Sequence, residues 1–266
     1  MPVTLEAIAE RTRETVAAAQ RERPIEVVQE RAADSTPPRS LYGVMTREDG
    51  ATHVIAECKR RSPSAGSIRD DFDAVDIALQ YENAGATGIS CLTDGPFFGG
   101  SLEDLTAIRG AVELPVLRKD FLVDPYQIWE ARAAGADAVL LIAELLDAPL
   151  LDELVGIADS LGMTCLIELH GIEQLDKVLA FAGEGRLVGI NNRNLRTMRT
   201  DIRHVTSMLE DLADHLPSVV CESGIRSHAD VTQLRSHGIR NFLVGESLLK
   251  QEHPGTALRT LLGESE

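Results

Sequence analysis

The stretch PVLRKDFLVDPYQIWEARAAGADAVLLIA, residues 115–143, contains one complete strand–helix–strand unit. Two short apolar runs, PVLRK and AVLLIA, flank a helical pattern that begins at Asp124 and Pro125 and ends at Gly135. Asp is a preferred N-cap, Pro suits the first turn of a helix, and Gly commonly follows the last turn. The pattern therefore predicts a strand, a helix and, after a short turn, a second strand.

Similar apolar runs recur on both sides of this unit. Each is too short for a helix and almost continuously apolar, which is typical of a strand buried on both faces. Helical patterns lie between them, for example at 73–85 and 228–238, and the runs start roughly 23–35 residues apart, as strand–helix units do. The eight runs are 53–59, 88–93, 115–119, 138–143, 164–169, 187–192, 218–223 and 241–246.

Eight such units in series, with no break in composition, predict an α/β fold, a closed (β/α)₈ TIM barrel. An open sheet of eight strands is the alternative. Residues 1–50 lie outside the repeat and contain two amphipathic helical patterns, 5–20 and 24–34, followed by the polar linker STPPRS. We expect them to form an N-terminal helical extension packed on the barrel, and residues 51–266 to form the barrel catalytic domain.

The charge of the chain is strongly negative, with 42 acidic residues against 26 Lys and Arg and a formal net charge of −16. Nucleic-acid binding requires a basic face, so no nucleic-acid partner is expected. An anionic ligand would need a local positive cluster. The N-terminus lacks the apolar core of a secretory signal, and no apolar run reaches the length of a membrane span. We therefore expect a cytoplasmic protein with no membrane partner.

Polar side chains gather where the predicted strands end. In a barrel of this kind the active site lies at the carboxyl ends of the strands. A lone charge at a strand end usually lies on a solvated rim, but charges from five strands that meet at one mouth indicate a functional site. These residues are Glu57, Lys59, Lys119, Glu168, Asn191, Arg193, Glu222 and Ser223.

The four cysteines lie inside the apolar runs, and no two of them form a CxxC pair; they are Cys58, Cys91, Cys165 and Cys221. They are expected to be small buried hydrophobic residues, with no metal site and no disulfide. Neighbours in a strand point to opposite faces. If the charged strand ends face the mouth, then Cys58, Cys165 and Cys221 point outward, toward the helices.

Two glycine-containing segments after the last two strands, 222–230 and 244–250, suggest a phosphate site. The first amides of a helix attract anions, and the loops after strands seven and eight of such barrels often bind phosphate. Gly224 and Gly245 would allow close approach of the backbone, although both could simply turn the chain. Across the mouth, KRRSPSAG (59–66) supplies the local positive cluster.

At these motifs the sequence resembles the indole-3-glycerol-phosphate synthase family, over essentially the whole chain. The pair formed by ECKRRSPS and KDFLVDPYQI is the most specific part of the resemblance. The other matching stretches are 97–105, 166–169, 188–195, 221–225 and 242–248. The resemblance implies a carbon–carbon lyase of tryptophan biosynthesis that closes an indole ring on 1-(2-carboxyphenylamino)-1-deoxyribulose 5-phosphate, with loss of CO₂ and water and without metal or cofactor.

The resemblance also implies roles for the polar strand ends. Lys119 would be the general acid that protonates the ketone oxygen during ring closure. Glu168 would transfer a proton in the dehydration, with Lys59 beside it as a partner for the substrate carboxylate or as a second acid. Which of the two acts in dehydration is left open. The residues expected to orient the substrate hydroxyls and the lysines are Glu57, Asn191 and Glu222.

The remaining site residues follow from the same resemblance. Arg193 would organise the site or clamp the substrate carboxylate. The expected wall for the aromatic ring is Phe98, Phe121, Pro63, Leu140 and Leu195, and the expected phosphate contacts are Ser62, Ser223, Gly224, Gly245, Glu246 and Ser247. The sequence departs from the family at Ala65, where many relatives have Lys. Arg61 either compensates for that charge or is a solvated loop residue.

Two other functions remain open on the residues alone. One is another phosphate-binding barrel isomerase or lyase, such as phosphoribosylanthranilate isomerase, which would use a Cys or Asp pair for acid–base work. The other is a non-catalytic barrel that serves as a binding module, which would predict loss of the polar strand ends. The expected partner is a small phosphorylated substrate, and the protein is expected to be a monomer or a weak homo-oligomer.

Overall fold

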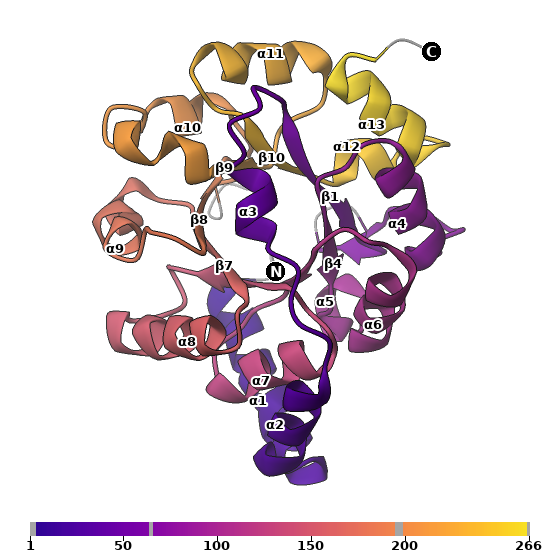
Figure 1. The fold of residues 1–266 in the computed structure, drawn as a ribbon, viewed down its shortest axis with the longest axis vertical. Coiled ribbons are helices and arrows are strands. Elements are labelled where there is room, and N and C mark those ends of the chain that lie inside the picture. The colour runs from indigo at the N-terminus through magenta and orange to yellow at the C-terminus, as the bar shows by residue number, and fades with distance from the viewer. Residues whose placement is uncertain (1–3, 64–65, 195–198, 265–266) are drawn as a thin grey trace.

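The computed structural model describes residues 4–63, 66–194 and 199–264. In this part of the chain, eight parallel strands close into one barrel, with each strand paired to its neighbours in chain order (Figure 1). They are β1 (His53–Cys58), β4 (Gly88–Leu92), β5 (Val116–Lys119), β6 (Ala138–Ile142), β7 (Thr164–Leu169), β8 (Arg186–Asn191), β9 (Val219–Glu222) and β10 (Asn241–Val244). The predicted strands and the TIM barrel are confirmed, and the open sheet is wrong.

Helices surround the barrel, one after each strand: α4 (Ala74–Asn83), α6 (Leu102–Ala111), α7 (Pro125–Ala133), α8 (Ala148–Ser160), α9 (Leu175–Leu179), α10 (Arg203–Thr206), α11 (His228–Ser236) and α13 (Pro254–Leu262). The side chain of Asp124 caps α7 by accepting from the Tyr126 amide, and Ser227 caps α11. The three helices predicted between strands are confirmed. Their ends differ by one or two residues, because the capping residues lie outside the helical hydrogen bonds.

Short elements occupy the loops at the carboxyl ends of the strands. They are the hairpin of β2 (Arg61–Ser62) and β3 (Gly66–Ser67), the helices α5 (Gly95–Phe98) and α12 (Glu246–Leu249), and the 3₁₀ turn η1 (Ile172–Gln174). A second 3₁₀ segment, η2 (Ala213–Ser218), precedes β9. These loops carry many of the side chains of the site described below.

The apolar core has two layers that follow the alternation of the strands. The inner layer fills the barrel with residues such as Ile55, Leu117, Leu140 and Leu166. The outer layer packs the strands against the helices and contains all four cysteines, which are buried and unpaired. The predicted outward orientation of Cys58, Cys165 and Cys221 is confirmed; the Cys58 sulfur, for example, lies 3.9 Å from the Ala74 oxygen in α4.

The N-terminal segment reaches both ends of the barrel. Its first two helices, α1 (Leu5–Glu22) and α2 (Ile25–Asp34), pack on α7, where the Tyr126 hydroxyl donates to the Arg23 oxygen at 3.1 Å (Figure 1). The first turns of α1 contribute Leu5 and Ile8 to a cavity at the carboxyl ends of the strands. None of the helices in the described ranges is long and apolar enough to cross a membrane.

The third helix of this segment, α3 (Leu41–Met45), closes the opposite end of the barrel and lies inside the ring of strands in Figure 1. Leu41 and Met45 belong to the inner apolar layer and are fully buried. The Tyr42 amide donates to the hydroxyl of Thr164, the first residue of β7, at 3.1 Å. Buried Asp137 fixes the linker by accepting from the Arg39 amide at 2.8 Å.

Candidate active site

A cavity of about 1130 Å³ opens at the carboxyl ends of the strands. Every site residue predicted from the sequence lines it, except Leu195, which lies outside the described residues. The residues brought together are Glu57, Lys59, Ser62, Pro63, Phe98, Lys119, Phe121, Leu140, Glu168, Asn191, Arg193, Glu222, Ser223, Gly224, Gly245, Glu246 and Ser247. They come from the strands of the barrel or from the loops that follow them.

Lys119, the last residue of β5, lies between two carboxylates. Its ammonium donates to Glu168 Oε2 at 3.0 Å and lies 3.4 Å from Glu222 Oε2. Burial alone would lower the pKa of Lys119, but Glu168, Glu222 and Glu57 outweigh burial, so this pKa lies above its ordinary value. The lysine is therefore held as an ammonium ion that can donate a proton or stabilise negative charge.

The two carboxylates beside Lys119 have opposite pKa shifts. Burial would raise the pKa of Glu168, but Lys119 and His170 outweigh it and lower this pKa. Burial and the charge of Glu168 together raise the pKa of Glu222 well above its ordinary value. A side-chain hydrogen bond between Glu222 and Glu168 adds to both shifts, raising the pKa of Glu222 and lowering that of Glu168. The pair therefore holds a base and an acid side by side.

A second lysine–glutamate pair lies at the end of β1. The Lys59 ammonium donates to Glu57 Oε1 at 2.6 Å, and both side chains are buried. The space for Glu57 comes from Gly245, since a Cβ there would lie 2.4 Å from Glu57 Oε1. Gly189 leaves similar room for Glu222, at the same distance of 2.4 Å from Oε1. Both glycines thus allow buried carboxylates to reach the mouth.

The loops after β9 and β10 meet at one side of the cavity. Ser223 and Gly224 follow β9 with φ of 63° and 87°, in the left-handed region, which turns the chain sharply. The Ser247 hydroxyl in α12 donates to the Ile225 oxygen at 2.9 Å and so joins the two loops. Arg193 lies nearby, with its guanidinium 3.6 Å from Glu246 Oε2. This side of the cavity thus presents first-turn amides and cationic side chains.

Two phenylalanines form an apolar wall of the cavity. The rings of Phe98 and Phe121 lie 5.9 Å apart at an interplanar angle of 39°. Phe98 ends α5, whose first amides are held by Asp94: the carboxylate accepts from the Phe97 and Phe98 amides at 2.6 and 3.0 Å. Leu140, which belongs to the inner apolar layer of the barrel, adds a further apolar side chain to the cavity lining. A flat aromatic ring would find apolar contacts here.

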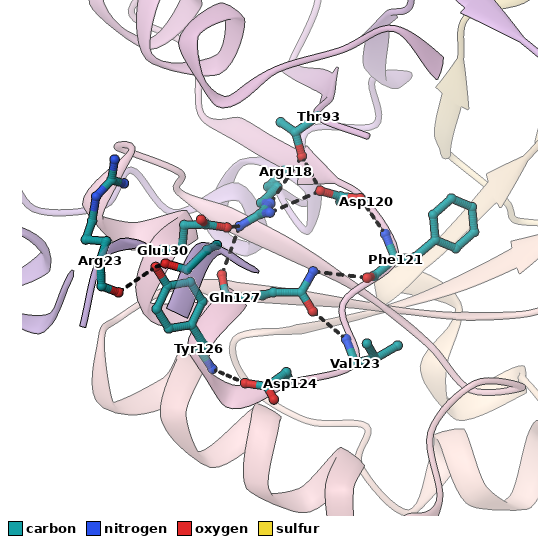
Figure 2. A network of polar contacts seen from close by, with 11 residues as sticks. Arg23, Thr93, Arg118, Asp120, Phe121, Val123, Asp124, Tyr126, Gln127 and Glu130 are labelled. Carbon is teal, nitrogen blue, oxygen red and sulfur yellow. Dashed lines mark hydrogen bonds and ion pairs between the residues drawn. The ribbon is translucent and has the colours of Figure 1, made fainter. Parts of the chain in front are cut away.

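Buried polar contacts hold the loop that carries Phe121 (Figure 2). Arg118 points outward from β5 and pairs with Asp120 and Glu130, each at 3.0 Å. Asp120 in turn accepts from the Phe121 amide at 2.8 Å. Gln127 in α7 completes the loop, since its amide nitrogen donates to the Phe121 oxygen at 3.1 Å. The outer face of β5 therefore fixes the loop that follows Lys119.

Comparison with known proteins connects this geometry to a family. The family model described as indole-3-glycerol phosphate synthase matches residues 5–261. The chain belongs to this family. It is 49% identical to the indole-3-glycerol phosphate synthase of Rhodopirellula baltica over 97% of this chain and 98% of that protein. It is 46% identical to that of Aromatoleum aromaticum over 94% and 95%. The expected enzyme class, a carbon–carbon lyase of tryptophan biosynthesis, is confirmed with the family.

Solved structures with lower identity share the barrel. KGPDC from Streptococcus mutans is 14% identical, with a TM-score of 0.60 over 80% of this chain and 96% of that one. N-acetylmannosamine-6-phosphate 2-epimerase from Clostridium perfringens is 15% identical, with a TM-score of 0.57 over 75% and 89%. At this identity the likeness shows the fold alone.

Not every expectation for the synthase family site agrees with the structure. Of the predicted positive cluster, Lys59 lines the cavity but Arg60 and Arg61 do not. The Arg61 guanidinium instead donates to the oxygens of Gly95 and Pro96 at 3.1 and 2.8 Å. Arg61 therefore lies outside the cavity, against the carbonyl groups of α5. Ala65 lies outside the described residues.

The structure adds cavity residues that sequence reasoning missed. They include His170, Arg199, Thr200, Arg226 and Lys250, together with Leu5 and Ile8 from α1. The sequence contains a signal that could have predicted His170: it follows Glu168 by two positions, and the alternation of a strand would place both side chains on one face. The rim cations gave none, since single charges in polar loops are common.

The rival functions weighed for the sequence find no support in the synthase site. An isomerase that uses a cysteine for acid–base work would need a thiol in the mouth, and all four cysteines lie in the outer apolar layer. The polar strand ends that a bare binding module would lose are present and converge on the cavity. Within the described ranges, no group of three His, Cys, Asp or Glu side chains is placed to hold a metal ion.

Proposed function

We propose that this protein converts 1-(2-carboxyphenylamino)-1-deoxyribulose 5-phosphate to indole-3-glycerol phosphate, CO₂ and water through the side chains that line its cavity. The observation that carries the proposal is the Lys119 ammonium, held between Glu168 and Glu222 at the centre of the mouth. Ring closure requires an acid at the ketone oxygen, where negative charge develops as the ring carbon attacks. Lys119 supplies that acid.

Glu222 and Glu57 keep the lysines in place and bind the sugar hydroxyls of the substrate. Their carboxyl groups are buried at 1% and 4% exposure, and each approaches one ammonium group. A buried carboxyl with an open oxygen gains by accepting or donating a hydrogen bond. Substrate hydroxyls supply such partners, and Asn191 at the end of β8 adds an amide on the same side.

After decarboxylation, loss of water needs one group that removes a proton and one that gives a proton to the leaving hydroxyl. Glu168 has the lowered pKa of a group that is ionised and can act as the base. Lys59 is the second candidate acid and also a partner for the substrate carboxylate, since its ammonium faces the cavity from the other side. Which of these two groups acts in dehydration is the part of the mechanism that pH–rate profiles of their variants would settle.

The substrate orientation follows from the two sides of the cavity. The phosphate lies at the loops after β9 and β10, where Ser223, Gly224, Gly245, Glu246 and Ser247 offer amides and hydroxyls, with Ser62 opposite. Anions bind well at such first-turn amides. The anthranilate ring lies against Phe98 and Phe121, with Pro63 and Leu140 around it. Arg193 lies beside the phosphate loops and organises them through its ion pair with Glu246.

Replacing Lys119 by Met tests the general acid directly. We expect turnover to fall by about 10²–10⁴-fold, the usual contribution of general acid–base catalysis. The assay adds the substrate to purified protein and follows indole fluorescence, with melting temperature and circular dichroism as controls for folding. A folded Lys119→Met variant at parental turnover would overturn the role of Lys119, and a parent protein without product would overturn the proposed activity.

Localisation, oligomeric state and partners belong to the same proposal. We propose a cytoplasmic enzyme that acts as a monomer or weak homo-oligomer, without nucleic-acid partners. The net charge of −16 supports the last point, because a polyanion is repelled. Sedimentation velocity at several protein concentrations would show the oligomeric state.

A further inference from the structure

His170 lies directly behind Glu168, on the side away from Lys119. Lys119 occupies one carboxylate oxygen of Glu168, Oε2, at 3.0 Å. The other oxygen, Oε1, lies 3.4 Å from Nε2 of His170. The two oxygens of the proposed base therefore have separate partners on opposite sides, and both partners can carry a proton.

A half-buried carboxylate, Glu144, holds His170 from behind. Glu144, in the loop after β6, accepts from the amides of His170 and Gly171 at 2.7 and 3.1 Å, and its Oε2 lies 3.4 Å from His170 Nδ1. Burial would raise the pKa of Glu144, but the hydrogen bonds from His170 and Gly171 outweigh it and lower this pKa. Glu144 is thus an acceptor, and the Nδ1 proton of His170 points toward it.

This arrangement leaves Nε2 of His170 aimed at Glu168. A carboxylate that accepts from one imidazole nitrogen orients the ring and stabilises its protonated form. The backbone is fixed as well, because Nε2 of His204 in α10 lies 2.7 Å from the His170 oxygen. The side chain of His170 is 9% exposed and lines the cavity, so its ring can move little.

We propose that His170 is a positioning residue for Glu168: with Glu144 at its Nδ1, its Nε2 faces Oε1 and receives the proton that Glu168 takes from the substrate. In that transfer the O–H bond of Glu168 breaks and an N–H bond forms at Nε2. Glu168 becomes a carboxylate again, and the imidazolium pairs with Glu144. The inference rests on the proposed role of Glu168 as a base.

Charged groups from several neighbouring elements face His170 and its partners. They are Glu144 from the β6 loop, Glu168 from β7 with Lys119 behind it, and His204, which reaches only the backbone oxygen. The two carboxylates stabilise the imidazolium that forms when Nε2 takes up the proton.

The experiment compares His170→Ala, His170→Asn and Glu144→Gln with the parent, using indole fluorescence. We expect His170→Ala and Glu144→Gln to lower kcat about 10- to 100-fold, below the full effect of a general base, with KM changed less than about threefold. His170→Asn keeps a polar side chain near Glu168 but cannot take up the proton, so it should lose kcat as His170→Ala does. The matched control is His253→Ala, because His253 is 72% exposed and lies outside the cavity.

A double variant separates positioning from a merely structural role. If His170 acts through Glu168, His170→Ala added to Glu168→Gln changes kcat little further, because the two effects are not additive. Additive losses, or parental kcat in all three single variants, would overturn the inference. Should His170→Ala fail to fold, the Asn and Glu144→Gln variants decide. Parental activity in Glu168→Gln would instead overturn the proposed base, whatever the His170 variants do.

Discussion

Three buried carboxylates, Glu57, Glu168 and Glu222, lie beside two ammonium groups in the mouth, those of buried Lys59 and half-buried Lys119. Three fully ionised acids would leave an uncompensated negative charge in a poorly solvated place, which is costly. Burial and the charge of Glu168 raise the pKa of Glu222, which favours its neutral acid form and so reduces the excess negative charge. Glu222 is therefore a side chain that the active site needs but that costs stability when it is ionised.

Glu222→Gln should change stability and turnover in opposite directions. A carboxyl whose folded pKa is raised contributes its full stability below the unfolded value of about 4.5 and loses it as pH rises through the folded pKa. Gln has no such loss, so the variant should gain free energy of unfolding relative to the parent as pH rises from about 4.5 to about 8, while turnover falls. Urea unfolding at several pH values checks this, and a difference that shrinks with rising pH would contradict it.

Gly245 should be as sensitive as a charged residue, for steric reasons. A methyl group there would lie 2.4 Å from Glu57 Oε1, so Gly245→Ala must displace the carboxylate that holds Lys59. Misplacement of about 1 Å can cost about 10²-fold in rate. The control is Gly156→Ala in α8, where a Cβ meets nothing within 4 Å; there we expect unchanged turnover and a stability gain of about 1 kcal/mol. Equal turnover in both variants would refute the steric argument.

Among the elements, β5 and α7 form the unit that positions the general acid. The outer face of β5 carries Arg118, and the inner face carries Lys119 one residue later, so one strand anchors the loop and supplies the catalytic group (Figure 2). The guanidinium of Arg118 also donates to the Gln127 oxygen at 3.0 Å, which ties the strand to the first turns of the helix. Rigid placement of Phe121 follows from these contacts.

Arg118→Leu should destabilise the protein strongly. It leaves the carboxylates of Asp120 and Glu130 buried without their cation, and loss of one partner from a buried pair costs about 3–5 kcal/mol. Arg203→Leu is the matched control, because the exposed pair of Arg203 with Asp201 should leave the unfolding curve unchanged. The comparison is made by urea unfolding. A parental midpoint for Arg118→Leu would show that the network does not hold the fold.

At the scale of the whole molecule, chemistry and stability occupy opposite ends of one barrel. The mouth contains the polar cavity, while α3 fills the other end with Leu41 and Met45. The contact of α3 with Thr164, the first residue of β7, fixes it at the amino ends of the strands. Separation of this kind is usual in TIM barrels, where the far face serves stability.

Leu41→Ala should reveal that separation. The side chain is fully buried, and such truncations cost about 2–5 kcal/mol. We expect a lower melting temperature but unchanged kcat and KM at room temperature, since the substitution lies across the barrel from Lys119. Thermal unfolding and indole fluorescence on the same preparation test both halves. A large change in kcat with parental stability would contradict the picture.

The sequence by itself determined the strands, the barrel and the strand ends whose polar side chains meet at the cavity. Short apolar runs at regular spacing can bury both faces only in a parallel sheet, and parallel topology gathers all carboxyl ends at one mouth. Alternation also fixed the face of each residue, which is why the cysteines could be assigned outward and Glu57 and Lys59 inward.

Only the tertiary structure decided which charges meet. Lys119 is near Glu168 and Glu222, and Lys59 near Glu57, because of strand register and the space left by Gly189 and Gly245. The outward turn of Arg61 and the support of His170 by Glu144 likewise depend on loops whose course no periodicity encodes. Alternation determines a face, whereas pairing and protonation depend on distances and burial in three dimensions.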